Sequence, residues 1–189
     1  MINKPSTHAL NGGFTLIELM ITVALAAILM TLAVPSFVQY QRNSELTSLT
    51  NSLLAAINTA KSEAMKTGKN AFVVPKGSGW NSGWIVYVDV NYDNSYTENT
   101  DRTVQTQDAV KSYFNITGNG TAAGTSPYIK FDSSGYSSSS TALSLQIART
   151  DTTSANAAEE SRRIVVARTG RVRSCKPSTD TSCTSSATQ

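Results

Sequence analysis

Residue types suited to catalysis are scarce in this chain of 189 residues, which has one histidine, His8, and two cysteines. Without further histidines, no serine or cysteine has the usual base beside it, and zinc lacks its common ligands. No glycine-rich phosphate loop follows an expected strand, and no pair of carboxylates suits acid–base work. We therefore expect no catalytic residue and no cofactor, and a protein that is not an enzyme.

An excess of one charge is also lacking, since 16 Lys and Arg residues face 13 Asp and Glu residues and the net charge is +3. The overall charge therefore gives no argument for binding nucleic acid, and only local clusters can do so. No internal repeat is evident. About 150 residues lie beyond the first apolar segment, which suits one globular domain with its own core.

One long apolar run extends from Phe14 to Val34 and is interrupted only by Glu18 and three threonines. At about 1.5 Å per residue, a helix of this length spans about 31 Å, enough to cross the hydrocarbon core of a membrane. A carboxylate inside a membrane helix costs about 2.5–3.5 kcal/mol even on lenient scales. Glu18, the only charge in the run, is therefore a candidate functional residue.

The start of this run, Gly13-Phe14-Thr15-Leu16-Ile17-Glu18, resembles the class III leader of type IV pilins and of type II secretion pseudopilins. The resemblance implies that a prepilin peptidase cleaves after Gly13 and that the new N-terminus at Phe14 is methylated. It also implies that Glu18 pairs with the N-terminus of a neighbouring subunit during assembly. The expected partners are other pilins or pseudopilins, the prepilin peptidase and the bacterial inner membrane. A single pass would leave the globular domain in the periplasm, before assembly into a pilus or pseudopilus.

A secretory signal peptide and a plain membrane anchor are the alternatives to a prepilin leader. A signal peptide needs a basic start and a small-residue cleavage site after the apolar core. Here Lys4 is the only basic residue before the run, and the small-residue match at Ala24-Leu25-Ala26 falls in its middle. A plain anchor would gain nothing from Glu18. The pattern therefore favours a leader at residues 1–13 and a transmembrane or filament-core helix at residues 14–35.

A second helical segment follows, because apolar residues recur at steps of three and four and form one stripe: Leu46, Leu49, Leu53, Ile57, Ala60 and Ala64. Pro35 should kink the helix between its two halves. Gly68 is suited to end it. We expect an amphipathic helix over residues 36–68 that continues the apolar helix into the globular domain.

Residues 69–174 have the pattern of a mostly antiparallel β-sheet, so the expected fold is α+β, with a long N-terminal helix packed on the sheet. The expected strands are rich in β-branched and aromatic residues: residues 71–74, 84–90, 112–116, 128–131, 143–148, 164–168 and 171–173. Residues 76–83 are expected to connect the first two strands as a hairpin. Residues 91–110 are expected to form a polar loop.

The two cysteines, Cys175 and Cys183, lie in a polar tail at residues 175–189. No histidine or third cysteine lies near them, so a zinc site is not expected. In a domain outside the cytoplasm, a disulfide between them is the default, and it would stabilise the fold by about 2–3 kcal/mol.

Three further motifs are similar to those of H-type pseudopilins and of FimT- and FimU-type minor pilins: residues 83–93, residues 131–135, and Arg168-Thr169-Gly170-Arg171-Val172-Arg173. The resemblance implies a type IV pilin-like fold and a structural subunit of a type IV pilus. The alternative is an H-type pseudopilin of a type II secretion system, which would contact exported substrates.

A basic cluster runs from Arg162 to Lys176, with six basic residues and no acidic one. On an extended segment Arg171 and Arg173 share one face, and Gly170 permits a tight turn beside them. Arginine forks bind phosphate oxygens bidentately, so the backbone of double-stranded DNA is a plausible ligand. The Gly-Arg-x-Arg pattern also resembles the DNA-binding motif of FimT-type pilins that act in natural transformation. The candidate residues are Arg168, Gly170, Arg171, Arg173 and Lys176; the alternatives are a charged strand edge that deters pairing, or contact with a partner pilin.

The segment Asp89-Val90-Asn91-Tyr92-Asp93 resembles the start of a calcium-binding loop, with oxygen ligands at alternate positions. However, Asn94 occupies the central glycine position, and Thr100 stands where a bidentate glutamate is needed. Asn and Asp also favour turns by themselves. We therefore expect no metal site here.

Overall fold

The computed structural model describes residues 13–139 and 142–184. The chain divides into two compact units, the first ending at Arg42 and the second beginning at Asn43. Helix α1 (Leu16–Thr67) contributes residues to both units.

In the first unit, α1 begins with a side-chain cap. The backbone N–H of Glu18 donates to Thr15 Oγ1 at 3.2 Å, and the N–H of Leu19 donates to the carbonyl of Thr15 at 3.1 Å. Thr15 and Glu18 have the spacing of a capping box, which stabilises the first turn of a helix. The large apolar side chains that follow are mostly exposed, as are Phe14 before them and Phe37 and Tyr40 near the end of this unit. An exposed apolar surface of this extent is typical of a helix that meets lipid or other subunits.

No single helix in the described part of the chain has the length and hydropathy needed to cross a membrane. Two helical segments, Leu16–Thr31 and Ser36–Thr67, are bent by 40° and satisfy the requirement together, by length and composition only. The bend falls where Pro35 was expected to kink the helix.

The second unit contains two four-stranded antiparallel sheets rather than the single sheet expected. One has the order β3-β2-β1-β5, with β1 (Ala71–Pro75), β2 (Trp84–Val88), β3 (Arg102–Gln107) and β5 (Ile129–Phe131). The other has the order β4-β6-β7-β8, with β4 (Phe114–Gly118), β6 (Leu143–Arg149), β7 (Ser161–Val166) and β8 (Val172–Cys175). Short 3₁₀ turns lie at Trp80–Ser82, Gly120–Ala122 and Ser154–Asn156.

The expected hairpin is confirmed, since β1 pairs with β2 from Ala71 opposite Val88 to Pro75 opposite Trp84. The prediction of a loop over residues 91–110 was wrong, because β3 lies within it and pairs with β2 along the edge of the sheet. No residue of β3 is buried, so its sequence carries no apolar alternation to mark it.

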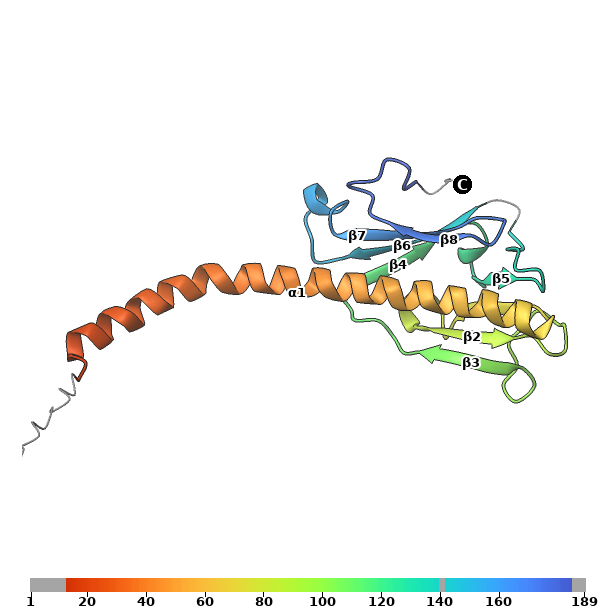
Figure 1. Ribbon diagram of the computed structural model, residues 1–189, viewed down its shortest axis with the longest axis horizontal. Helices are drawn as coiled ribbons and strands as arrows, with labels where there is room; N and C mark the ends of the chain where they lie inside the picture. Colours follow the sequence, from red (N-terminus) through yellow and green to blue (C-terminus); the bar gives the residue numbers. More distant parts are fainter. Residues whose placement is uncertain (1–12, 140–141, 185–189) are drawn as a thin grey trace, which may run out of the picture. The chain divides into compact units, whose positions relative to one another are not determined.

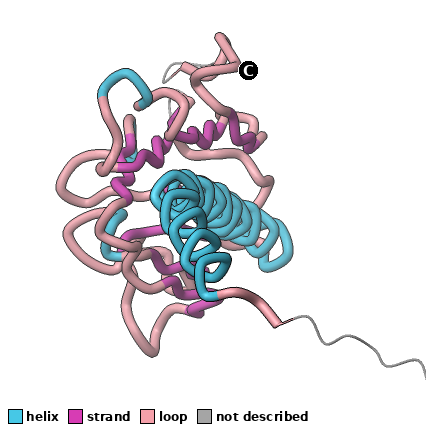
Figure 2. The backbone as a smooth tube through the Cα atoms, turned by 90° about the vertical axis from the view of Figure 1, so that its left-hand side faces the viewer, coloured by secondary structure: helices cyan, strands magenta, loops and turns pink. Residues whose placement is uncertain are grey.

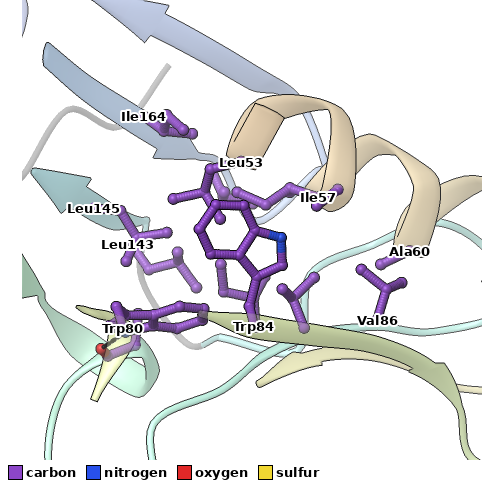
Figure 3. Close-up of a cluster of buried hydrophobic side chains, with 14 of the residues drawn as sticks. Leu53, Ile57, Ala60, Trp80, Trp84, Val86, Leu143, Leu145 and Ile164 are labelled. Carbon is purple, nitrogen blue, oxygen red and sulfur yellow. Dashed lines mark hydrogen bonds between the residues drawn. The ribbon is translucent and has the colours of Figure 1, made fainter. Parts of the chain in front are cut away.

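The core lies between α1 and the inner faces of both sheets. Figure 1 shows β2 and β3 on one side of the C-terminal half of α1 and β4, β6, β7 and β8 on the other, and the end-on view of Figure 2 shows the helix between the two sets of strands. The apolar stripe of the helix is buried as expected, and Leu53 and Ile57 are 0% exposed. Figure 3 shows both side chains beside the fully buried Trp84. Every buried residue of this core lies at or beyond Leu46. A fragment that begins at Asn43 therefore keeps the whole core and is expected to fold on its own.

Helix α1 ends as its sequence predicts. Gly68 has a left-handed φ of 68°, and its N–H donates to the carbonyl of Ala64 at 3.0 Å.

Candidate functional site

The leader motif meets the described structure at its last residue, because Gly13 is the first described residue and residues 1–12 lie outside the described part. Phe14 is 82% exposed and Glu18 is exposed. Cleavage after Gly13, methylation of Phe14 and docking through Glu18 stay predictions.

The basic motif lies on a tight turn, residues 167–171, which we call the Gly170 turn. The N–H of Gly170 donates to the carbonyl of Ala167, and the N–H of Ala167 donates to the carbonyl of Arg171, both at 2.9 Å. Gly170 has a φ of 76°, in the left-handed region that favours glycine. The turn therefore needs glycine at this position.

Helix α1 and residues 135–137 hold the Gly170 turn in place. Lys61 of α1 donates through Nζ to the carbonyl of Gly170 at 2.8 Å, and the N–H of Ser137 donates to the carbonyl of Arg168 at 3.0 Å. A Cβ on Gly170 would lie 1.8 Å from the carbonyl oxygen of Gly135, which shows how closely the two backbones approach. Two of the motifs singled out in the sequence thus form one contact. Lys61 is a part of the site that the sequence did not indicate.

Arg168 and Arg171 flank Gly170 and are exposed. Within the described residues, neither guanidinium takes part in a hydrogen bond or an ion pair. The hydrogen bonds of Arg168 and Arg171 that hold the turn are made by their backbone carbonyls. These two positive charges are therefore available to a ligand without breaking an existing contact.

Arg173 differs from the expectation of two similar forks side by side. Its Nη1 lies 3.2 Å from Asp180 Oδ2, and its Nη2 donates to the carbonyl of Ser182 at 2.9 Å. The pKa of the Asp180 carboxyl is lowered, first by a hydrogen bond from the Ser182 hydroxyl and then by Arg173. Arg173 thus holds the tail, and its charge is matched by a carboxylate.

Lys176 is also paired, with its Nζ 2.5 Å from Glu159 Oε2. This hydrogen bond lowers the pKa of the Glu159 carboxyl. The sequence placed Lys176 in an acid-free cluster, but the fold supplies an acid from the β6–β7 connection.

The predicted disulfide is present between Cys175 and Cys183, whose Cα atoms are 5.8 Å apart. Cys183 is 5% exposed and Cys175 is half-buried, so the Cys183 end of the bond packs against the domain. The loop it closes is compact, since the N–H of Asp180 donates to the carbonyl of Lys176 and the N–H of Cys183 donates to that of Asp180, both at 3.0 Å. This loop positions the Asp180 and Ser182 groups that bind Arg173.

The carboxylates of the Asp89–Asp101 segment accept hydrogen bonds from nearby backbone N–H groups. Asp89 accepts from Asn94 at 3.1 Å, Asp93 from Ser95 at 2.8 Å, and Asp101 from Val90 and Thr97 at 3.0 and 2.8 Å. Among the described residues, no group of three or more His, Cys, Asp or Glu side chains is arranged to hold a metal ion. The carboxylates act here as caps of a looped backbone.

Two family models match the chain: "Type II transport protein GspH" over residues 49–170 and "Prokaryotic N-terminal methylation motif" over residues 9–34. Among curated proteins, a fimbrial protein of Pseudomonas aeruginosa is 34% identical over 90 residues, which cover 47% of this chain and 50% of the relative. The type IV major pilin protein PilA of Myxococcus xanthus is 44% identical over 52 residues, covering 28% and 24%. The chain thus spans half or less of the length of these curated relatives.

Two solved structures share the fold. The type IV minor pilin FimU of Pseudomonas aeruginosa aligns with a TM-score of 0.57 at 17% identity, covering 74% of this chain and 94% of that one. The minor pseudopilin EpsH of the type 2 secretion system of Vibrio cholerae aligns with a TM-score of 0.51 at 16% identity, covering 70% and 98%. At this identity the likeness concerns the fold alone. With its methylation motif and its pilin-like α+β fold, the chain belongs to the GspH family of type II transport proteins and has the fold of pilins and pseudopilins.

Proposed function

We propose that the chain is a minor pilin of a type IV pilus that presents the Gly170 turn to double-stranded DNA. The observation that carries the proposal is the pair of exposed, unpaired guanidiniums of Arg168 and Arg171 on a turn fixed to α1 by Lys61. Arginine binds phosphate through a planar fork, so two free guanidiniums on one turn suit the phosphates of a nucleic-acid backbone. Such contacts carry no base readout, and we expect binding without sequence preference.

The contacts of Arg173 and Lys176 set the expected strength of binding. Both are paired with carboxylates, so they add little net positive charge at the surface. Each neutralised phosphate contributes about −0.9 to the slope of log K against log salt concentration. With Arg168 and Arg171 as the main contacts, we expect a slope of about −2 and affinity in the non-specific range, micromolar or weaker.

The test is a fluorescence-anisotropy titration of a labelled DNA duplex with the fragment 43–189 at several salt concentrations. The double variant Arg168→Gln, Arg171→Gln should lose most of the binding and flatten the slope by about two units. The matched control is Lys76→Gln with Lys111→Gln, which removes the same charge from two other places in the fold, where these lysines pair with Asp108 and Glu45. Equal loss in both double variants, or no binding by the wild type at low salt, would contradict the assignment to this turn.

The N-terminal segment supports a second part of the proposal. The chain is anchored in the inner membrane with its globular domain in the periplasm, the prepilin peptidase cleaves after Gly13, and Phe14 is methylated. Glu18 then docks against the N-terminus of a neighbouring pilin, where opposite charges attract strongly in a medium of low dielectric constant. The methylation-motif match over residues 9–34 supports this proposal.

Mass spectrometry of filament-associated protein tests the processing: the mature chain should begin with a methylated Phe14, and Gly13→Ala should leave the precursor in the membrane. Glu18→Ala should keep membrane insertion, because it removes an insertion cost, and should abolish recovery in sheared filaments. An unmodified N-terminus before Gly13, or normal recovery of Glu18→Ala, would refute the respective step.

A pseudopilin of a type II secretion system that contacts exported substrates is the second candidate, and the GspH family match favours it. Deletion of the gene separates the two. Loss of pili with normal secretion supports the minor pilin, and loss of secretion with normal pili supports the pseudopilin.

A further inference from the structure

A depression beside the Gly170 turn combines a free arginine with an exposed aromatic ring. Its volume is about 450 Å³, within the range of small-molecule sites. The Gly170 turn contributes Arg168, and the remaining lining comes from the segment that follows β5: Asp132, Tyr136, Ser137, Ser138 and Ser139. These two segments contact each other where Gly135 meets Gly170, so the contact that fixes the turn also holds the lining together.

Tyr136 supplies the aromatic ring. It is 53% exposed, and within the described residues its ring contacts no other ring and its hydroxyl takes part in no hydrogen bond. Its backbone is fixed, because its N–H donates to Asp132 Oδ1 and its carbonyl accepts the N–H of Asp132, both at 3.0 Å. An exposed ring on a fixed backbone can stack on a ligand at a low cost in entropy.

Arg168 and Ser137 supply polar groups without partners. The Arg168 guanidinium is free, as described above, and its carbonyl accepts the N–H of Ser137 at 3.0 Å, which keeps Arg168 next to the residue that follows Tyr136. Ser137 is 4% exposed, and its Oγ is a buried atom with no hydrogen-bond partner among the described residues. A buried hydroxyl without a partner calls for an explanation, and a ligand held in the depression that Ser137 lines would supply one.

The carboxylate of Asp132 narrows the choice of ligand. Its Oδ1 accepts the N–H groups of Ser134 and Tyr136 at 2.8 and 3.0 Å, so it shapes the turn that presents the ring. A negative charge in the same depression as Arg168 disfavours a small anion that is charged throughout, such as inorganic phosphate. A nucleotide avoids this conflict, because its phosphate is charged and its base is neutral.

We propose that this depression binds one unpaired nucleotide of DNA, with the base stacked on the Tyr136 ring and a phosphate on the Arg168 guanidinium. An aromatic ring beside a basic side chain is the combination that binds single strands, because every base has a face that can stack and every nucleotide carries a phosphate. The inference rests on the proposed binding of DNA by the Gly170 turn. It adds the form of DNA that binds best, a duplex with a single-stranded end.

The test compares three DNAs in fluorescence-anisotropy titrations of the fragment 43–189: a blunt duplex, the same duplex with a short single-stranded overhang, and the same overhang made of abasic nucleotides. The abasic overhang carries the same phosphates without bases, so it separates stacking from charge. For the wild type, the natural overhang should bind at least about fivefold more tightly than the abasic overhang, the lower limit for one stacked base.

The ratio of these two dissociation constants is then measured for three variants. Tyr136→Ala should bring the ratio close to one, whereas Tyr136→Phe should keep it, because the ring remains. Tyr92→Ala is the matched control, since this tyrosine is 58% exposed and lies outside the lining, and it should also keep the ratio. Thermal unfolding of Tyr136→Ala should match that of the wild type, because the side chain is exposed.

The outcomes separate this inference from the proposed function. A ratio near one in the wild type, or an unchanged ratio in Tyr136→Ala, overturns the inference, and binding of the blunt duplex through Arg168 and Arg171 can still hold. Binding of the natural overhang that depends on Tyr136, without binding of the blunt duplex, supports the depression and contradicts the proposed binding of double-stranded DNA. No binding of any of the three DNAs at low salt concentration overturns both.

Discussion

The replacement of Gly170 by alanine tests whether close backbone packing holds the Gly170 turn in place. A Cβ at this position would lie 1.8 Å from Gly135 O and 3.3 Å from Lys61 Cε. The backbone of Gly135 is the obstacle, so the Gly170 turn and the turn at residues 131–135 must move apart.

The cost has two parts. An alanine at a φ of 76° costs about 1–2 kcal/mol for the left-handed conformation. Movement of the turn also breaks the bond from Lys61 to the Gly170 carbonyl, and a hydrogen bond to a charged group contributes about 1.5–3 kcal/mol. The total is about 2.5–5 kcal/mol. For a domain of this size it lowers Tm by roughly 5–20 °C.

Gly68→Ala is the matched control, because Gly68 has a φ of 68° and no atom lies within 4 Å of its would-be Cβ. It carries the conformational cost alone, about 1–2 kcal/mol, and should lower Tm by roughly 2–8 °C. Thermal unfolding of both variants of the fragment 43–189, followed by circular dichroism, measures the difference. If Gly170→Ala loses no more stability than Gly68→Ala, the close packing of the two turns is refuted.

Four further perturbations follow from the structure. Arg149→Ala should destabilise the domain by about 3–5 kcal/mol in urea unfolding, because its fully buried side chain pairs with Asp151 and Glu160; a loss below 1 kcal/mol would contradict this. Leu53→Ala should cost about 2–5 kcal/mol in the same assay, since Leu53 is 0% exposed, whereas Ala55→Gly on the exposed side of the helix should cost only about 1 kcal/mol. Reduction of the Cys175–Cys183 bond should lower the free energy of unfolding by about 2–3 kcal/mol. Because it releases Arg173, reduction should also steepen the salt slope of DNA binding by about one unit; an unchanged slope would show that the loop does not restrain Arg173. The contact of Asp180 stabilises the tail at pH values above the ordinary aspartate pKa, and it is lost as the pH falls through the lowered pKa of Asp180. In an NMR titration, the Ser182 amide resonance should therefore shift at a pH below the ordinary aspartate pKa rather than near it.

The fold was predictable where side-chain periodicity carries the information. The stripe from Leu46 to Ala64 is buried, Gly68 ends the helix, and the hairpin of β1 and β2 lies where alternating β-branched residues and a glycine-rich connection placed it. These features depend on local residues, so a local pattern reveals them. Strand β3 was missed because it is an edge strand without a buried residue. The division into two sheets was missed because nothing local to a strand records which strand pairs with it.

The candidate site was predictable only in part, for a related reason. The leader, the disulfide and the Gly170 turn are short motifs, and each is defined by residues that lie close together in the sequence. The partners of the basic cluster are not adjacent: Lys61 is 109 residues from Gly170, and Glu159 is 17 residues from Lys176. Asp180 is only seven residues from Arg173, but its role depends on the fold of the loop that Cys183 closes. A run of basic residues in a sequence therefore overstates the free charge on a surface.

This division of charge limits what one subunit can do with DNA. Two free guanidiniums give a salt slope of about −1.8, so a fourfold rise in salt weakens binding only about 12-fold, but from a weak starting affinity. A single Gly170 turn is then unsuited to retain a duplex at physiological salt concentration. Retention requires either several Gly170 turns on one filament, whose linked contacts raise the effective concentration of binding sites near the duplex, or basic residues supplied by neighbouring pilins. The proposal therefore predicts that a filament retains DNA at salt concentrations at which the isolated fragment 43–189 has released it, and equal salt sensitivity of filament and fragment would count against a role in DNA capture.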